Sequence, residues 1–206
     1  MNKKYPMTGI ILAGGKNSRV NGSNKAFFKV GTQTIFERIY QVMNSFFDDL
    51  IVVTRTPEDF LDWDIMIVSD VYQAHCSLNG IYSGLLYAAN SKAFIVACDT
   101  PYISKELIGF MCESYQNSCD VYYPQTEKGK EPLFAIYSKR CLNCFKNYLQ
   151  LGKYKITKCI KGLKTNTISE STLRQKDPNL LSFYNVNTAE DLAYANRKLE
   201  EKFNET

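Results

Sequence analysis

The stretch Thr8-Gly-Ile-Ile-Leu-Ala-Gly-Gly15, close to the start of the chain, decides the fold class. Its first six residues are largely apolar and rich in β-branched side chains, which predicts a buried strand that ends in a flexible Gly-Gly turn. Arg19 and Lys25 follow the turn, and their side chains can reach phosphates that backbone N–H groups hold. We therefore expect a phosphate-binding loop here, with a solvated surface turn as the alternative. The segment matches neither the Walker pattern nor the dinucleotide Gly-x-Gly-x-x-Gly pattern.

Strands and helices alternate along the rest of the chain. Short apolar runs predict further strands at residues 50–53, 65–68, 93–97, 121–123 and 133–137. Helical spacing and capping patterns predict helices at residues 35–46, 81–90, 105–114 and 139–149, and a last helix that opens at residues 188–191. This alternation predicts an α/β fold, a three-layer, Rossmann-like arrangement of a mainly parallel sheet with helices on both faces. Ligands of such folds bind outside the carboxyl ends of the strands.

The composition narrows the class of protein. The 206 residues are 45% hydrophobic and 22% charged, which suits one folded domain over residues 1–206. The net charge is +4 without a long basic run, so we expect small anionic ligands and no nucleic acid partner. The apolar run at residues 10–13 is too short for a signal peptide or a membrane span, so we expect no membrane association. Seven cysteines without the spacing of a disulfide framework favour the cytoplasm.

Glycines and polar residues mark four predicted strand ends, at Gly14-Gly15, Thr54, Asp70 and Asp99. Asp99 is suited to hold Mg²⁺, because Mg²⁺ typically takes one or two carboxylates together with substrate phosphates. Capping of the following helix is the alternative role for Asp99, although Ser104 already offers a cap nearby. Asp70 could assist at the metal or bind a nucleotide.

Five segments resemble motifs of the molybdenum cofactor guanylyltransferases, which belong to the MobA-like NTP transferase family. Residues 12–25 resemble the signature Leu-Ala-Gly-Gly-x-x-x-Arg-Met-Gly with its following Lys, residues 80–84 the family's Gly-Pro-Leu-Ala-Gly, and residues 98–101 its Asp-x-Pro. Residues 131–135 are similar to its Pro-Leu-x-Ala segment, and residues 185–192 to its Asn-x-Asn-Thr-Pro-Glu-Glu-Leu. Order and spacing fit over nearly the whole chain, so the resemblance implies the nucleotidyltransferase fold and activity.

The resemblance implies that GMP passes from GTP to the terminal phosphate of molybdenum-molybdopterin, giving molybdopterin guanine dinucleotide and pyrophosphate. Mg²⁺ is the implied cofactor, with Asp99 as its ligand. The expected catalytic residues are Asp99, Lys25, which would neutralise charge on the triphosphate, and Arg19, which would stabilise the departing pyrophosphate. The implied nucleotide-binding residues are Leu12, Ala13, Gly14, Gly15, Lys25, Thr54, Asp70, Gly80 and Asp99. Asn185 and Asn187 would either contact the molybdopterin substrate or cap the last helix.

A few departures from the family leave other functions open. Val20, Asn21 and Thr54 stand where relatives usually have Met, Gly and Asn. The alternatives are a cytidylyltransferase acting on molybdopterin or on a sugar or polyol phosphate, and a non-catalytic nucleotide-binding cofactor carrier. The resemblance also implies that residues 1–115 mainly bind the nucleotide and residues 116–206 the pterin substrate. Transient contacts with molybdopterin-handling proteins and molybdoenzyme chaperones are expected as well.

Overall fold

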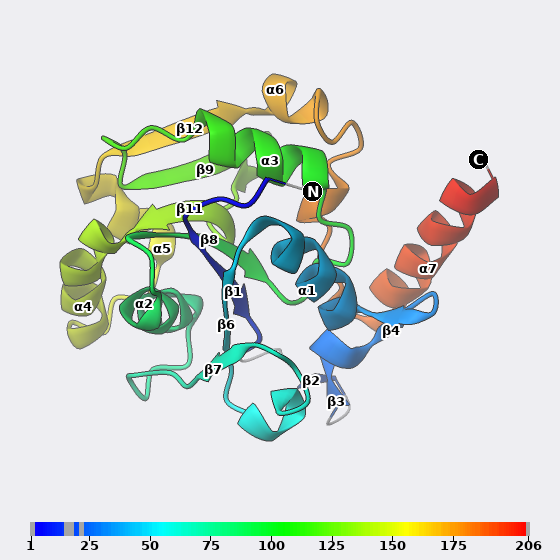
Figure 1. Ribbon diagram of the computed structural model, residues 1–206, viewed down its shortest axis with the longest axis horizontal. Helices are drawn as coiled ribbons and strands as arrows, with labels where there is room; N and C mark the ends of the chain where they lie inside the picture. Colours follow the sequence, from blue (N-terminus) through cyan, green and yellow to red (C-terminus); the bar gives the residue numbers. More distant parts are fainter. Residues whose placement is uncertain (1–2, 15–18, 21–22, 205–206) are drawn as a thin grey trace.

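An eight-stranded, mainly parallel sheet forms the centre of the computed structural model (Figure 1). The structure describes residues 3–14, 19, 20 and 23–204, of which 19, 20, 23 and 202–204 are described by their backbone alone. Strand β1 (Thr8–Leu12) is central and pairs in parallel with β6 (Asp49–Val53) on one side and β8 (Lys92–Ala97) on the other. Beyond β6 lies the edge strand β7 (Met66–Val68). The predicted α/β fold with a mainly parallel sheet is confirmed.

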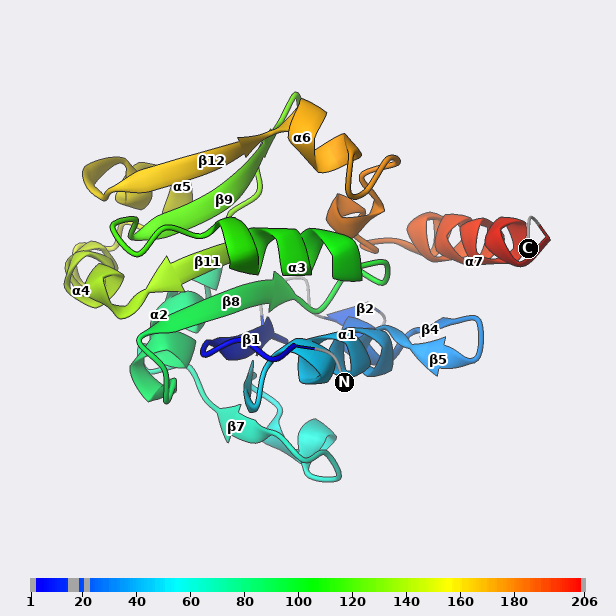
Figure 2. The same cartoon turned by 45° about the horizontal axis from the view of Figure 1, so that its top comes forward.

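The other half of the sheet contains a reversal of strand direction. Strand β11 (Phe134–Ser138) runs antiparallel between β8 and β9 (Val121–Thr126). Strand β10 (Gly129–Lys130) forms a hairpin with the end of β9, and β12 (Thr165–Ser169) runs parallel to β9. Because only β11 and β10 are reversed, the carboxyl ends of β1, β6, β8, β9 and β12 lie on the same edge of the sheet (Figure 2). Ligands of such a sheet are expected at this edge.

Helices cover both faces of the sheet (Figure 1). On one face lie α1 (Ile35–Phe46) and α3 (Lys105–Ser114). On the other face lie α2 (Ser77–Tyr87), α4 (Leu142–Gln150) and the short α5 (Ile156–Cys159). The three-layer arrangement that the sequence predicts is therefore present.

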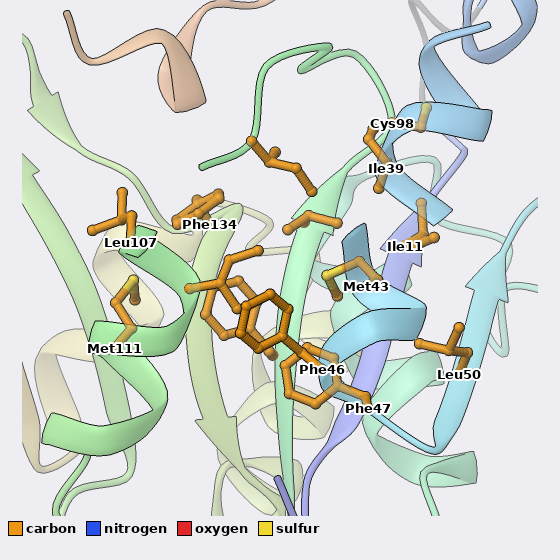
Figure 3. Close-up of a cluster of buried hydrophobic side chains, with 14 of the residues drawn as sticks. Ile11, Ile39, Met43, Phe46, Phe47, Leu50, Cys98, Leu107, Met111 and Phe134 are labelled. Carbon is orange, nitrogen blue, oxygen red and sulfur yellow. The ribbon is translucent and has the colours of Figure 1, made fainter. Parts of the chain in front are cut away.

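Each face of the sheet carries its own apolar core, because successive side chains of a strand point to opposite faces. Ile11 of β1 belongs to the core beneath α1 and α3, and its neighbour Ile10 belongs to the core beneath α2 and α4. Figure 3 shows the first core, to which α1 contributes Met43 and α3 contributes Met111. All four side chains are fully buried, so β1 is fixed from both faces.

A capping side chain sets where α1 begins. The hydroxyl of Thr34 accepts a hydrogen bond from the backbone N–H of Glu37 at 3.1 Å, and the Glu37 side chain bonds back to Thr34, which completes the predicted capping box of α1. Helix α2 begins at Ser77, earlier than the predicted start after Gly80. Its first turn includes Asn79, a polar residue that can be buried here because its amide donates to the carbonyl oxygen of Tyr72 at 2.6 Å.

Short elements complete the fold. Two small hairpins pair β2 (Arg19–Val20) with β3 (Ser23–Asn24) and β4 (Lys29–Val30) with β5 (Gln33–Thr34). Single 3-10 turns, η1 to η5, occur at Lys25–Phe27, Pro57–Phe60, Lys139–Cys141, Ile160–Gly162 and Leu181–Phe183. Helix α6 (Glu170–Arg174) follows β12, and α7 (Ala189–Asn204) projects from the body of the molecule (Figures 1 and 2). No helix in the described part of the chain is long and apolar enough to cross a membrane.

Candidate active site

The carboxyl ends of β1, β6 and β8 stand level with one another. Leu12 at the end of β1 is in register with Val53 on one side and with Ala97 on the other. Just beyond the strands, the backbone N–H of Cys98 still donates to the carbonyl oxygen of Leu12 at 3.0 Å. The residues that follow the three strands, Asp99 among them, therefore emerge at one place on the sheet edge.

A small cavity lies at these strand ends, beside the first turn of α2. Its lining consists of Leu12, Gly14, Val53, Arg55, Asp70, His75, Cys76, Ser77 and Gly80. Four of these, Leu12, Gly14, Asp70 and Gly80, are residues for which the sequence predicts nucleotide contact. The structure thus brings four predicted residues from three separate segments together around one cavity.

Three glycines near this cavity serve different purposes. A Cβ at Gly80 would come 3.3 Å from a methyl of Leu12, and a Cβ at Gly84, one turn later, would come 2.8 Å from a methyl of β1. Glycine at these two positions therefore lets α2 lie close against the sheet. At Gly14 the nearest atom to an added Cβ would be the carbonyl oxygen of Val53, at an ordinary contact distance of 3.8 Å. Packing therefore does not require glycine at position 14. Gly14 lines the cavity, so the absence of a side chain there matters for the cavity and not for the packing of the fold.

The electrostatic character of the cavity comes from Asp70 and its neighbours. Burial raises the pKa of the Asp70 carboxyl, while Arg55 and His75 lower it. Thr54 does not belong to the lining, because its side chain is 1% exposed and its hydroxyl accepts a hydrogen bond from the backbone N–H of Thr56 at 3.1 Å. The next residue, Arg55, lines the cavity instead.

Asp99 follows β8 and carries an unsatisfied atom. Among the described residues, its Oδ1 is the buried side-chain atom left without a hydrogen-bond partner. Burial raises the pKa of this carboxyl, while a backbone N–H and the charge of Lys25 lower it. Ser104 caps α3 by accepting from the N–H of Leu107 at 3.1 Å, so capping does not account for Asp99. A buried carboxylate oxygen without a partner is costly, and a divalent cation is a ligand that would satisfy it.

Lys25 is a second buried charge at the same place, with a side chain 3% exposed. Its Nζ donates to Oδ1 of Asn187 at 3.1 Å, although 162 positions separate the two residues. The backbone N–H of Val186 in turn donates to the carbonyl oxygen of Asp99 at 2.8 Å. The segment before α7 is therefore tied both to Lys25 and to the strand end that carries Asp99.

Thr188, and neither of the two predicted asparagines, caps α7. Its hydroxyl accepts from the N–H of Asp191 at 3.1 Å, and the Asp191 carboxylate accepts from the N–H of Asn187 at 2.8 Å. The capping role considered for Asn185 and Asn187 is thus wrong. The Asn187 side chain is engaged with Lys25, and Asn185 is exposed at the border of a larger pocket.

Comparisons with known proteins identify the family. The model of the MobA-like NTP transferase domain matches residues 9–166. The chain belongs to this family. A molybdenum cofactor guanylyltransferase from Desulfosudis oleivorans is 40% identical, over 92% of this chain and 94% of the relative. A probable molybdenum cofactor guanylyltransferase from Natranaerobius thermophilus is 36% identical, over 94% of this chain and 96% of the relative.

Solved structures share the fold. The molybdopterin-guanine dinucleotide biosynthesis protein A from Archaeoglobus fulgidus has a TM-score of 0.83 at 22% identity, covering 95% of this chain and 100% of that one. The 2-C-methyl-D-erythritol 4-phosphate cytidylyltransferase from Thermus thermophilus has a TM-score of 0.65 at 10% identity, covering 93% and 98%. Proteins named for different nucleotides thus have the fold of the MobA-like family, and the fold alone does not select the base.

The predicted phosphate-binding loop lies partly outside the described residues. Gly15 lies outside the described residues. Arg19 is described by its backbone, which pairs with Asn24, the residue before Lys25. Sequence reasoning did not assign Arg55 or His75 to the site. The signal for Arg55 is its position directly after a predicted strand end, whereas His75 lies in a loop without a recognisable pattern.

Proposed function

We propose that the protein transfers GMP from GTP to the terminal phosphate of molybdenum-molybdopterin, forming molybdopterin guanine dinucleotide and pyrophosphate. Membership of a nucleotidyltransferase family, with similar relatives named molybdenum cofactor guanylyltransferases, supports the enzyme class and the reaction. The observation that carries the proposal is the pair of buried charges at the strand ends. Lys25 and Asp99 are close enough for the lysine to lower the pKa of the aspartate, and Oδ1 of Asp99 has no partner.

The guanosine part of GTP would lie along the backbone of residues 12–14, beside the small cavity. Gly14 presents no side chain there, so a base can approach the main chain closely. Asp70 and Arg55 line the same cavity and supply a hydrogen-bond acceptor and donors. This arrangement supports a nucleotide base at the cavity.

The reaction would be an in-line attack of the acceptor phosphate on the α-phosphorus of GTP. The new bond forms as the bond from the α-phosphorus to the bridging oxygen breaks, and pyrophosphate leaves with the electron pair. The phosphate nucleophile is already ionised, so His75 is not needed as a general base. Lys25 would neutralise charge on the triphosphate, and Arg19 would stabilise the pyrophosphate.

Nucleotidyltransferases of this kind generally depend on a divalent metal ion, and we infer that the ion is Mg²⁺. Its ligand from this chain would be Asp99, because the unpartnered Oδ1 is the type of oxygen that Mg²⁺ takes. When bound, Mg²⁺ would supply a positive charge that orients the phosphates and offsets their negative charge. Asp99 would hold the ion through its unpartnered Oδ1.

We further infer a cytoplasmic location and a division of labour along the chain. All seven cysteines lie in the described residues as free thiols, which supports a reducing compartment. Residues 1–115 would supply most of the nucleotide site and residues 116–206 most of the acceptor site. Transient contacts with molybdopterin-handling proteins and molybdoenzyme chaperones would deliver the acceptor and take the product.

Pyrophosphate release tests the proposed function directly. It is measured with molybdenum-molybdopterin and Mg²⁺ while GTP, CTP and ATP are compared, and GTP should be preferred at least about tenfold. Asp99→Ala should lower kcat/KM for GTP by about a hundredfold or more, because an electrostatic contact to the transition state is lost. Asp62→Ala, at an exposed aspartate, is the matched control and should keep the wild-type rate. A preference for CTP would indicate a cytidylyltransferase, and binding of GTP without any release would indicate a non-catalytic carrier.

A further inference from the structure

Three cysteine thiols lie close together on the face of the sheet that α2, α4 and α5 cover. Cys141 immediately precedes α4, Cys144 lies in the first turn of that helix, and Cys159 is the last residue of α5. Figures 1 and 2 show both helices on the side of the molecule opposite to α7. None of the three cysteines lines the cavity at the strand ends. Among the described residues, no group of three or more His, Cys, Asp or Glu side chains is placed to hold a metal ion.

Cys144 and Cys159 are in direct contact. Their Sγ atoms lie 3.5 Å apart, and the Cys144 Sγ also donates to the carbonyl oxygen of Cys159 at 3.6 Å. The two sulfurs need only close from this distance to the roughly 2.0 Å of a disulfide bond. Cys141 is placed differently, because its Sγ donates to the carbonyl oxygen of Asp120 at 3.4 Å. The geometry therefore pairs Cys144 with Cys159.

The two paired thiols differ in their access to solvent. Cys144 is half-buried, whereas Cys159 is 1% exposed. Burial raises the pKa of the Cys159 thiol, and the neighbouring Cys144 raises it further. A thiol with a raised pKa is largely protonated and reacts slowly with dissolved oxidants, since the thiolate is the nucleophile. An oxidant from solvent therefore reaches Cys144 first, and Cys159 is placed to react in a second step.

The chain that connects the two cysteines can adjust to a shorter contact. Residues 151–155, between α4 and α5, are exposed throughout. Gly152 makes the turn there with a φ of 67°, in the left-handed region that glycine adopts readily. Helix α5 is itself a short element of four residues, Ile156–Cys159. A small movement of α5 towards α4 can be absorbed in this surface connection.

We propose that Cys144 and Cys159 form an oxidisable thiol pair that closes to a disulfide bond when a peroxide is present. First, the Cys144 sulfur attacks one oxygen of hydrogen peroxide, the O–O bond breaks, and a sulfenic acid forms as water leaves. Next, the Cys159 sulfur attacks the Cys144 sulfur, the S–O bond breaks, and the hydroxyl leaves as water with the Cys159 proton. The two thiols lose two electrons in total, and the peroxide is reduced to two molecules of water.

The bond would join α4 covalently to α5. It closes the loop of residues 144–159 and so restricts the unfolded chain, which stabilises the folded protein. A disulfide has no proton to lose, so the burial that disfavours a Cys159 thiolate does not disfavour the bond. Disulfides of cytosolic proteins are usually transient and redox-sensing, so a thiol reductant should open this one again.

Peptide mapping tests whether the bond forms. The full-length protein is treated with hydrogen peroxide, free thiols are alkylated, and tryptic peptides are analysed by mass spectrometry without reduction. Trypsin separates residues 141–146 from residues 159–161, so the bond appears as a cross-linked peptide that dithiothreitol releases. The cross-link should form in the wild type and in the control Cys141→Ser, and should be absent from Cys144→Ser. A wild type whose Cys144 is oxidised without any cross-link, or a cross-link that survives in Cys144→Ser, would overturn the proposal.

Thermal unfolding measures what the bond does to the fold. Peroxide should raise the thermal midpoint of the wild type by about 5 °C or more, and dithiothreitol should reverse the change. Cys141→Ser should respond as the wild type does. Cys144→Ser and Cys159→Ala, which each lack one sulfur of the pair, should show no rise. A midpoint that falls in the wild type as the cross-link forms would show that the bond strains the fold, and the pair would not be one that the structure is built to close.

Discussion

The Asp99 carboxylate is buried at the end of β8 with one oxygen unpartnered, and burial raises its pKa. A carboxyl group whose pKa is higher in the folded than in the unfolded state favours the protonated form on folding. Above its ordinary pKa, the ionised group therefore lowers the free energy of unfolding. The negative charge of Asp99, which the proposed reaction needs, therefore destabilises the folded protein.

Removal of that charge should make the metal-free protein more stable and inactive. Asp99→Asn should raise the free energy of unfolding by about 1 kcal/mol, hence the thermal midpoint by roughly 2–4 °C for a chain of this size. Thermal unfolding in the presence of a chelator measures the stability, and pyrophosphate release measures the activity. If the variant is less stable than the wild type, the Asp99 carboxylate stabilises the folded protein through an interaction that the structure does not show.

Gly14 is the residue at which binding of the base at the cavity can be tested without disturbing the fold. Gly14→Ala adds a methyl at ordinary contact distance from Val53, so the thermal midpoint should change by no more than about 2 °C. The same methyl occupies space at the cavity, so kcat/KM for GTP should fall about tenfold or more. Gly162→Ala, where an added Cβ meets no atom within 4 Å, is the control. If the kinetics with GTP were unchanged, the base would not bind at this cavity.

At the scale of elements, the sequence predicted those with a strong local signal. β1 and β8 are continuous apolar runs, and α1 and α3 begin at capping residues, so their bounds are confirmed within a residue or so. β12 was not predicted, because Ile168 is its only buried residue and no apolar run marks it. The reversed direction of β11 was not predicted either, because orientation depends on the partner strands rather than on local pattern.

At the start of α7, local hydrogen bonds hold the turn that presents Asn187 to Lys25 in the candidate site. The Asp191 carboxylate accepts from the N–H groups of Asn187 and Thr188, and these bonds lower its pKa below the ordinary value of 3.8. A carboxyl with a lowered pKa in the folded state stabilises the fold when it is ionised. This contribution is complete above the ordinary pKa and is lost as the pH falls through the lowered value.

Asp191→Asn should therefore lower the thermal midpoint at neutral pH, and the difference from wild type should shrink as the pH falls below about 4. The turn that presents Asn187 to Lys25 should loosen too, which raises the KM for GTP a few-fold. Thermal unfolding across this pH range and GTP kinetics at neutral pH measure the two effects. Glu190→Gln removes a neighbouring exposed charge and should change neither. A difference in stability that is independent of pH would show that the Asp191 charge does not hold the turn.

At the scale of the whole molecule, the candidate site is assembled from both ends of the chain. Leu12, Gly14 and Asp99 could be predicted from the sequence because Leu12 ends a recognisable strand of a parallel sheet and the other two residues follow such strands. The contact between Lys25 and Asn187 could not be predicted, because it depends on how the segment before α7 returns across the sheet edge. The resemblance assigned Asn187 to the acceptor, whereas the structure joins it to the lysine expected to contact the nucleotide.

Two asparagines two positions apart provide a matched test of this assembly. Asn187→Ala removes the oxygen that accepts a hydrogen bond from the buried Lys25. A hydrogen bond to a charged group is worth about 1.5–3 kcal/mol, so the KM for GTP should rise severalfold and kcat should fall. Asn185→Ala alters only the border of the larger pocket, so it should raise the KM for the acceptor and leave GTP kinetics unchanged. Initial rates over a grid of both substrate concentrations separate the two effects. If Asn187→Ala changed the KM for the acceptor alone, Asn187 would face the acceptor during turnover, and its bond to Lys25 would belong only to the ligand-free protein. If both variants changed both constants, the two subsites would be coupled through the segment before α7, and the division between nucleotide and acceptor residues would have to be abandoned.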